Sequence, residues 1–254
     1  MDLKIKNFFK NNKIENVLFD MDNTLMDTDI YYQENMINTT QEVVEITLNI
    51  PEEKQVEMAK EIYSFARKIF IENGLPVLID NRTKEVIEAY FKTYNILYDE
   101  EKISNHIKQS YKDFYKTAPL IFPSTLDKLH SINELGIKIG VYSHAQHDWT
   151  EIKIEKIKDE YKKKYNKEIV LPFFTTEITN LKDYQGWKKA GEYHSFILQN
   201  TLVVGDSLTS DIYPAIEAGY MHLIYLSHGR EVPEFKTISK VYITNDISTL
   251  FSFL

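Results

Sequence analysis

Cysteine is absent from this chain of 254 residues. Its absence excludes disulfide bonds, thiolate zinc sites and cysteine nucleophiles. No apolar stretch reaches the roughly 20 residues that a membrane-spanning helix needs. Residues 1–13, in which lysines alternate with apolar residues, contain neither the hydrophobic core nor the small-residue cleavage site of a secretory signal. We therefore expect a cytoplasmic protein with no membrane partner.

An excess of basic charge is also lacking. The chain has 38 acidic and 30 basic residues and a formal net charge of −8, whereas nucleic-acid-binding domains carry a clustered basic surface. We therefore expect no nucleic-acid partner. The length is sufficient for one large core with a second unit inserted into it. The composition leaves the oligomeric state open.

The most informative segment is Asp20-Met21-Asp22-Asn23-Thr24-Leu25, which directly follows the apolar run Val17-Leu18-Phe19. A short apolar run bounded by polar residues predicts a buried strand. Side chains two positions apart in an extended chain point the same way, so Asp20 and Asp22 reach one small volume where the strand ends. Like charges repel there unless a cation or a shared proton stabilises them. The competing interpretation is that both residues only end a strand and cap a turn.

The remaining residues have two kinds of pattern. From about residue 30 to 118, apolar residues recur every three or four positions, which is typical of amphipathic helices. After residue 119, helical segments alternate with apolar runs at 137–142, 169–174, 201–204, 222–226 and 241–243. This alternation predicts a parallel sheet covered on both faces. The predicted fold class is therefore α/β, with residues 1–27 and 119–254 forming a Rossmann-like core and residues 28–118 an inserted α-helical domain.

Polar residues follow several predicted strands at their carboxyl ends, which is the edge where parallel sheets bind ligands. The polar residues expected at this edge are Asp20, Ser143, Lys182, Asp206 and Asp211. Each alone has a structural explanation, as a cap, a turn residue or a solvated lysine. Their convergence at one edge of the sheet indicates a binding or catalytic site.

With these motifs, the chain resembles the haloacid dehalogenase superfamily, and in particular its phosphatase branch with a helical cap. The resemblance rests on Asp20-Met21-Asp22-Asn23-Thr24, on Ser143 after an apolar strand, on a lysine before a helix, and on Gly205-Asp206 with Asp211. It covers residues 1–25 and 120–254, and the helical block occupies the place of the family's cap. The resemblance implies that the helical domain closes over the site.

The resemblance further implies a Mg²⁺-dependent phosphatase that hydrolyses a small phosphorylated metabolite through an aspartyl-phosphate intermediate. Asp20 would be the nucleophile, and Asp22 would protonate the leaving oxygen and then activate water. Ser143 would donate a hydrogen bond to the phosphoryl group, and Lys182 would neutralise charge in the transition state and hold Asp20 in place. The residues implied to hold Mg²⁺ are Asp20, Asp22 through its backbone carbonyl, Asp206 and, close by, Asp211.

The lysine assignment is open at the sequence level. Members of the family commonly have Lys-Pro before this helix, whereas Asp183 follows Lys182 here. Lys188 and Lys189 lie nearby and compete for the role.

Three further residues have open roles. The family often has Asn-Gly after the serine, whereas this chain has His144-Ala145, and His144 could face the substrate. His144 and His147 are not expected to bind a metal, because no third ligand is apparent. Arg82, next to Asn81, could grip a substrate carboxylate or a second phosphate, or it could be a solvated residue at a helix start.

Asp22 discriminates among the reactions of the family. A halide leaving group needs no proton, and dehalogenases lack an acid at this position, whereas an alkoxide needs one. Phosphate-ester chemistry is therefore preferred. A phosphomutase resembling β-phosphoglucomutase and a non-catalytic binding protein are the alternatives, and retained carboxylates that repel one another speak against the second. Sugar phosphates, phosphoglycolate and nucleotides all stay open as substrates.

Overall fold

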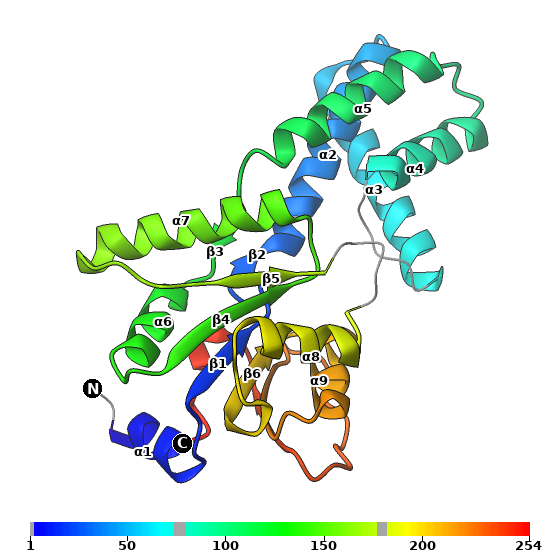
Figure 1. Ribbon diagram of the computed structural model, residues 1–254. Coiled ribbons are helices and arrows are strands. Elements are labelled where there is room, and N and C mark those ends of the chain that lie inside the picture. Colours follow the sequence, from blue (N-terminus) through cyan, green and yellow to red (C-terminus); the bar gives the residue numbers. More distant parts are fainter. Residues whose placement is uncertain (1–2, 74–79, 177–181) are drawn as a thin grey trace. The chain divides into compact units, whose positions relative to one another are not determined.

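The computed structural model describes residues 3–73, 80–176 and 182–254. The chain divides into two compact units (Figure 1). Residues 1–27 and 118–254 form one, here called the core unit, and residues 28–117 form the helical unit. The second junction thus lies one residue before the predicted boundary.

Six strands form the sheet of the core unit, in the order β5-β4-β1-β6-β7-β8. Their bounds are β1 Asn16–Phe19, β4 Lys138–Ser143, β5 Phe173–Thr175, β6 Thr201–Gly205, β7 His222–Leu226 and β8 Lys240–Thr244. Every neighbouring pair is parallel, which confirms the predicted α/β fold class. All four residues of β1 are buried, as its nearly uninterrupted apolar sequence requires of a central strand.

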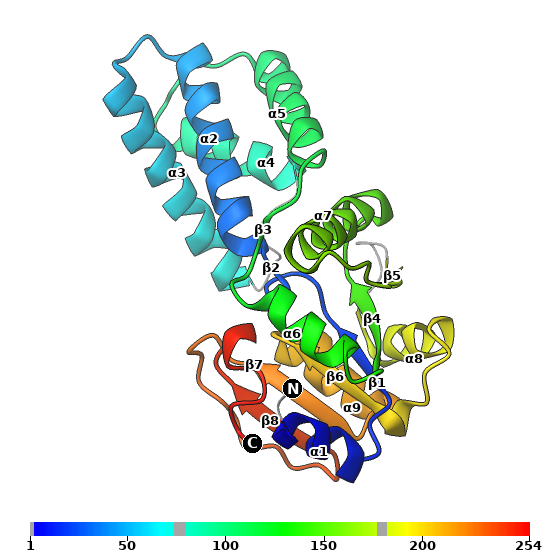
Figure 2. The ribbon, with the colours of Figure 1, turned by 90° about the vertical axis from the view of Figure 1, so that its left-hand side faces the viewer.

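Helices cover both faces of this sheet (Figures 1 and 2). Their bounds are α1 Leu3–Asn11, α6 Thr125–Asn133, α7 His147–Tyr165, α8 Tyr184–Tyr193 and α9 Tyr213–Ala218, with a π-helical turn Leu208–Ile212 and short 3-10 helices at Leu198–Asn200 and Ile247–Thr249. Successive side chains of a strand point to opposite faces. Val17 and Phe19 accordingly pack with α1, α6 and α7, whereas Leu18 packs with α8 and α9.

The described residues of the helical unit form the helices α2 Thr28–Thr47, α3 Glu52–Asn73, α4 Asp80–Thr93 and α5 Glu100–Phe114. The α5 stripe of Ile103, Ile107, Tyr111 and Phe114 is fully buried, as the spacing of three and four predicts. The chain leaves and re-enters the core unit through an antiparallel pair of two-residue strands, β2 Met26–Asp27 and β3 Leu120–Ile121.

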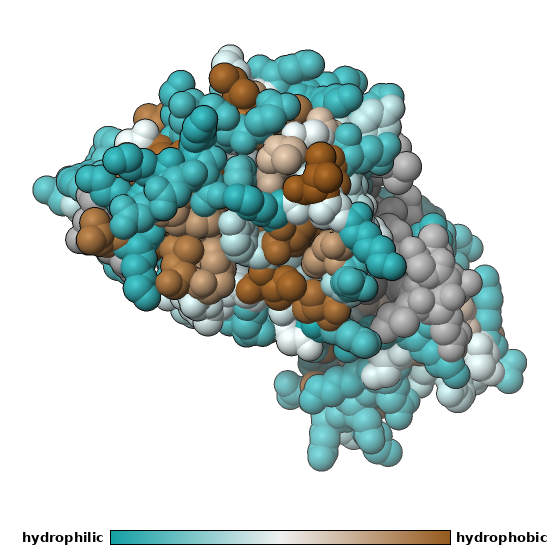
Figure 3. Space-filling view, turned by 90° about the horizontal axis from the view of Figure 1, so that it is seen from below, coloured by the Kyte–Doolittle hydropathy of each residue, from teal (hydrophilic) through white to brown (hydrophobic). Residues whose placement is uncertain are grey.

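Apolar side chains also occur on the surface. Figure 3 shows one face on which hydrophobic residues gather in the middle and hydrophilic residues surround them. Such apolar surface is ordinary for a folded protein. Among the described residues, no helix combines the length and the apolar character needed to cross a membrane.

Candidate active site

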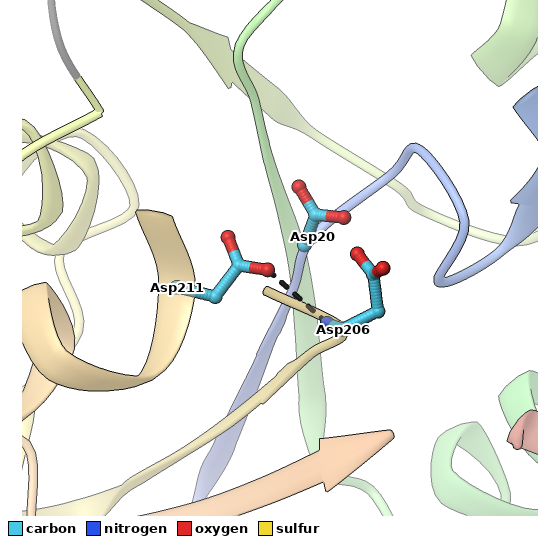
Figure 4. Close-up of side chains that lie close together, drawn as sticks. All are labelled: Asp20, Asp206 and Asp211. Carbon is cyan, nitrogen blue, oxygen red and sulfur yellow. Dashed lines mark hydrogen bonds between the residues drawn. The ribbon is translucent and has the colours of Figure 1, made fainter. Parts of the chain in front are cut away.

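Asp20 and Asp206 follow two adjacent strands at their carboxyl ends. Phe19 of β1 is in register with Val204 of β6, and the Asp20 N–H donates to the Val204 carbonyl at 2.8 Å. Asp211 comes from the π-helical turn after β6. The three acids are buried, and one carboxylate oxygen of each lies within 4.8 Å of the others (Figure 4). The fold thus brings together the three residues whose side chains were predicted to lie at the metal; the fourth, Asp22, was predicted to contribute its backbone carbonyl.

Asp211 organises the loop that ends β6. Its Oδ2 accepts hydrogen bonds from the N–H groups of Asp206 at 3.1 Å and Ser207 at 2.9 Å. A Cβ on residue 205 would lie 2.6 Å from this oxygen, so only glycine lets the loop wrap so closely around the carboxylate. This packing explains the spacing of Gly205-Asp206 and Asp211.

Lys182 lies between two of the acids. It is buried, its Nζ forms an ion pair with Asp20 and donates to Asp211 Oδ1 at 2.6 Å, and it lies 4.9 Å from the centroid of the Tyr142 ring. Lys188 and Lys189 are exposed on α8. Of the three candidate lysines, Lys182 is therefore the one whose ammonium contacts the acid cluster.

Asp183, which stands in place of the family's proline, has a local role of its own. Its side chain accepts a hydrogen bond from the Gly186 N–H at 2.9 Å and caps the start of α8. An aspartate at this position satisfies an N–H that the first turn of a helix leaves without a partner. The departure from the family's Lys-Pro pattern thus leaves the helix start intact.

The cluster has more negative than positive charge. Burial, followed by repulsion from Asp211, raises the pKa of Asp20 well above its ordinary value, despite the ion pair with Lys182. The same two causes raise the pKa of Asp206 to about 7, although Arg230 donates to this carboxylate at 3.0 Å. Burial alone would lower the pKa of Lys182, but Asp20 and Asp211 outweigh it and raise that pKa. Buried carboxylate oxygens with this charge imbalance fit a hard divalent cation such as Mg²⁺.

A pH-dependent stabilisation by Mg²⁺ follows from these pKa values. Because the pKa of Asp206 is raised from 3.8 to about 7, the folded chain without a cation holds more protons than the unfolded chain between these values. It therefore loses stability as pH rises through that window. Mg²⁺ competes with those protons, so the gain in Tm on adding Mg²⁺ should be larger near pH ~8 than near pH ~5. Thermal unfolding checks this, and an equal gain at both pH values would contradict it.

Asp22 lies apart from the cluster of three acids. Its Oδ2 accepts a hydrogen bond from the buried Ser143 hydroxyl at 3.3 Å, and its Oδ1 forms an ion pair with Lys153. A quarter of the Asp22 side chain is exposed. The two carboxylates thus have different surroundings. That of Asp20 lies in the cluster of three acids, and that of Asp22 contacts Ser143 and Lys153.

Lys153 was not among the predicted site residues. It is fully buried on α7, and its Nζ lies 3.4 Å from the centroid of the Trp149 ring. Burial lowers the pKa of this ammonium, and the ion pair with Asp22 offsets part of that effect. A signal was present in the sequence, because Lys153 shares the apolar seam of Ile157 and Tyr161, where a solvated lysine is not expected.

The other candidates lie elsewhere or have other partners. Arg82 pairs with Glu85 on its own helix at 2.9 Å. His144 has a buried Nε2 for which the described part of the chain offers no hydrogen-bond partner, while the His147 ring packs against Phe173. The segment 75–79 and the side chain of residue 81 lie outside the described residues.

Known structures resemble the chain, whereas no family model and no curated protein matches its sequence. A haloacid dehalogenase-like hydrolase from Xanthomonas campestris has a TM-score of 0.60 and 14% identity, covering 93% of this chain and 88% of that one. The chain has the haloacid dehalogenase-like fold. A putative β-phosphoglucomutase from Thermotoga maritima (TM-score 0.59, 13% identity, 95% and 100% covered) shares that fold. A putative hydrolase from Bacillus subtilis, bound to magnesium, also shares it, with a TM-score of 0.57 and 16% identity over 95% of this chain and 98% of that one.

The haloacid dehalogenase-like fold does not by itself decide the reaction, since one fold can host several chemistries. Structures of dehalogenases and of a phosphatase also match the chain. The reaction is therefore determined by the side chains of the site.

Proposed function

We propose that the protein is a Mg²⁺-dependent phosphatase that hydrolyses a small phosphorylated metabolite in the cytoplasm through an aspartyl-phosphate on Asp20. The observation that carries this proposal is the buried cluster of Asp20, Asp206 and Asp211 with Lys182 at the carboxyl end of the sheet. A fourth acid, Asp22, is partly exposed, and its carboxylate is not part of that cluster. The two kinds of acid match the two tasks of phosphate-ester hydrolysis, which are nucleophilic attack and proton transfer.

Asp20 supplies the nucleophile. One carboxylate oxygen attacks phosphorus, and the bond from phosphorus to the ester oxygen breaks. Lys182 keeps the Asp20 side chain in place through its ion pair and offsets negative charge in the transition state. The groups that would hold Mg²⁺ are the side chains of Asp20 and Asp206 and the backbone carbonyl of Asp22. Asp211 would also contribute, because it lies in the same cluster. When bound, Mg²⁺ supplies positive charge that lets an anionic phosphoryl group approach a carboxylate.

Asp22 supplies the acid and base. Its protonated carboxyl gives a proton to the departing alkoxide, and the resulting carboxylate then takes a proton from the water that hydrolyses the aspartyl-phosphate. Ser143, whose single O–H donates to Asp22 here, would turn it to a phosphoryl oxygen when the substrate is bound. An acid here favours phosphate esters over carbon–halogen bonds, because a halide leaves without a proton.

Phosphate release from 4-nitrophenyl phosphate and from a panel of small phosphate esters tests the proposal. We expect release that depends on added Mg²⁺ and stops with a chelator. A sugar phosphate that is isomerised with little phosphate release, in the presence of a bisphosphate activator, would favour the phosphomutase alternative. No turnover of any phosphate ester, with halide released from a 2-haloacid, would overturn the proposal.

A further inference from the structure

We propose that Lys153 is a positioning residue that holds the Asp22 carboxyl group in the orientation from which, once it carries a proton, it protonates a poor leaving group. The inference rests on the function proposed above and extends it to a residue outside the four motifs. Asp22 has both oxygens engaged by the core unit: Lys153 pairs with Oδ1 and Ser143 donates to Oδ2. Contacts at both oxygens restrict the rotation of the carboxyl group about its last side-chain bond.

The position of Lys153 is costly unless it serves Asp22. None of its side chain is exposed, and a single ion pair often fails to recover the desolvation cost of burying an ammonium. The methylene chain could be replaced there by an apolar residue with similar packing. A buried lysine on an apolar helix face is therefore poorly explained by stability alone.

Trp149 also contacts the Lys153 ammonium. Its ring lies one helical turn before Lys153, with Nζ 3.4 Å from the ring centroid, and Trp149 is itself buried. An aromatic ring attracts a cation that lies over its face, and this attraction replaces part of the stabilisation that water would give the cation. The Lys153 ammonium is thus held by contacts with both a buried ring and the Asp22 carboxylate, as expected of a residue that sets an orientation.

The consequence concerns the leaving group. An alkyl ester of phosphate needs a proton delivered to its leaving oxygen, whereas a nitrophenolate leaves readily without one. If Lys153 orients Asp22, its removal should slow the hydrolysis of alkyl esters much more than that of nitrophenyl phosphate. A lysine that only stabilises the fold would affect both substrates alike.

The variants are Lys153→Met, which keeps the volume and removes the charge, and Lys153→Gln, which keeps a hydrogen-bond donor. With glycerol phosphate we expect Lys153→Met to lower kcat/KM by about 10- to 100-fold, and with nitrophenyl phosphate by less than about 3-fold. Lys153→Gln should recover part of the loss. Lys158→Met is the matched control, because Lys158 lies on the same helix and pairs with Glu155 at the surface.

The double variant Lys153→Met with Asp22→Asn completes the test. If Lys153 acts through Asp22, adding Lys153→Met to Asp22→Asn should cause little further loss of kcat/KM with glycerol phosphate, the substrate on which Lys153→Met alone has its large effect. Equal losses on both esters, or a full additional loss in the double variant, would overturn the inference while leaving the phosphatase intact. If Lys153→Met does not fold, the same comparison of kcat/KM for the two substrates is made with Lys153→Gln, and unequal losses support the inference. A wild-type protein inactive on every phosphate ester of the panel would instead overturn the proposed function, and this inference with it.

Discussion

Asp20→Asn should lower Mg²⁺-dependent phosphate release by at least about 10⁴-fold. The amide nitrogen and oxygen that replace the carboxylate are too weak as nucleophiles to form an acyl-phosphate. The substitution keeps the shape of the side chain and removes one of three carboxylates that lie within 4.8 Å of one another. We therefore expect the fold to be retained, and kcat measured at saturating substrate and Mg²⁺ reports the chemical step.

Two controls accompany this variant. Asp159→Asn removes an exposed acid of α7 and should leave kcat within about 2-fold, as is usual for a surface substitution remote from a site. Thermal unfolding of Asp20→Asn should show a Tm equal to or above that of the wild type, because repulsion in the cluster is reduced. Phosphate release that persists in folded Asp20→Asn would remove Asp20 from the role of nucleophile.

Lys182→Met should reduce both activity and stability. The ammonium is the positive group that Asp20 and Asp211 share, and removing one partner of a buried ion pair typically costs about 3–5 kcal/mol. For catalysis, the loss of a positioned charge at the phosphoryl group should lower kcat by roughly 10²- to 10³-fold. Urea unfolding gives the first quantity, and steady-state kinetics with excess Mg²⁺ gives the second.

Lys188→Met is the matched control for this prediction. Lys188 is exposed, and its Nζ lies 5.3 Å from the centroid of the Tyr184 ring on the same helix. We expect its loss to change kcat by less than about 2-fold and stability by less than about 0.5 kcal/mol. If Lys188→Met were the variant that lost activity and Lys182→Met were not, the contacts of Lys182 would be structural only.

The parallel sheet could be predicted because its strands are short, continuous apolar runs between helical segments. The run at 222–226 coincides with β7 His222–Leu226. The run at 169–174 was less informative, since β5 spans only Phe173–Thr175 while Ile169 and Leu171 are buried without being in a strand. An apolar run indicates that its residues are buried, but it does not by itself show that they pair in a strand.

Local geometry was harder to predict. The segment Ser124 to Asp127 has the spacing of a capping box, but Ser124 has a φ of 70° and makes no capping hydrogen bond with its side chain. Instead, the Thr125 hydroxyl donates to the Leu25 carbonyl at 3.1 Å. That partner is a hundred residues away, so its contribution could not be read from the local pattern.

The acid cluster could be predicted because strand ends of a parallel sheet converge, whatever the loops between them do. The partner of Asp22 was harder to predict. The place of Lys153 on the apolar seam of Ile157 and Tyr161 indicates burial, but the many Lys and Glu residues of this helix indicate a solvated face, and no local pattern connects the helix with Asp22. Only the assembled fold shows that the buried ammonium pairs with Asp22.

The most direct test of the account is to trap the phosphorylated enzyme in Asp22→Asn with nitrophenyl phosphate and Mg²⁺. This leaving group needs no acid, so Asp20 should still be phosphorylated, while the missing base slows the hydrolysis that follows. The account predicts a burst of one nitrophenolate per enzyme and, after acid quenching, a peptide containing Asp20 that is heavier by one phosphoryl group. Turnover that proceeds without such a peptide, with the phosphoryl group on another residue or on none, would contradict it.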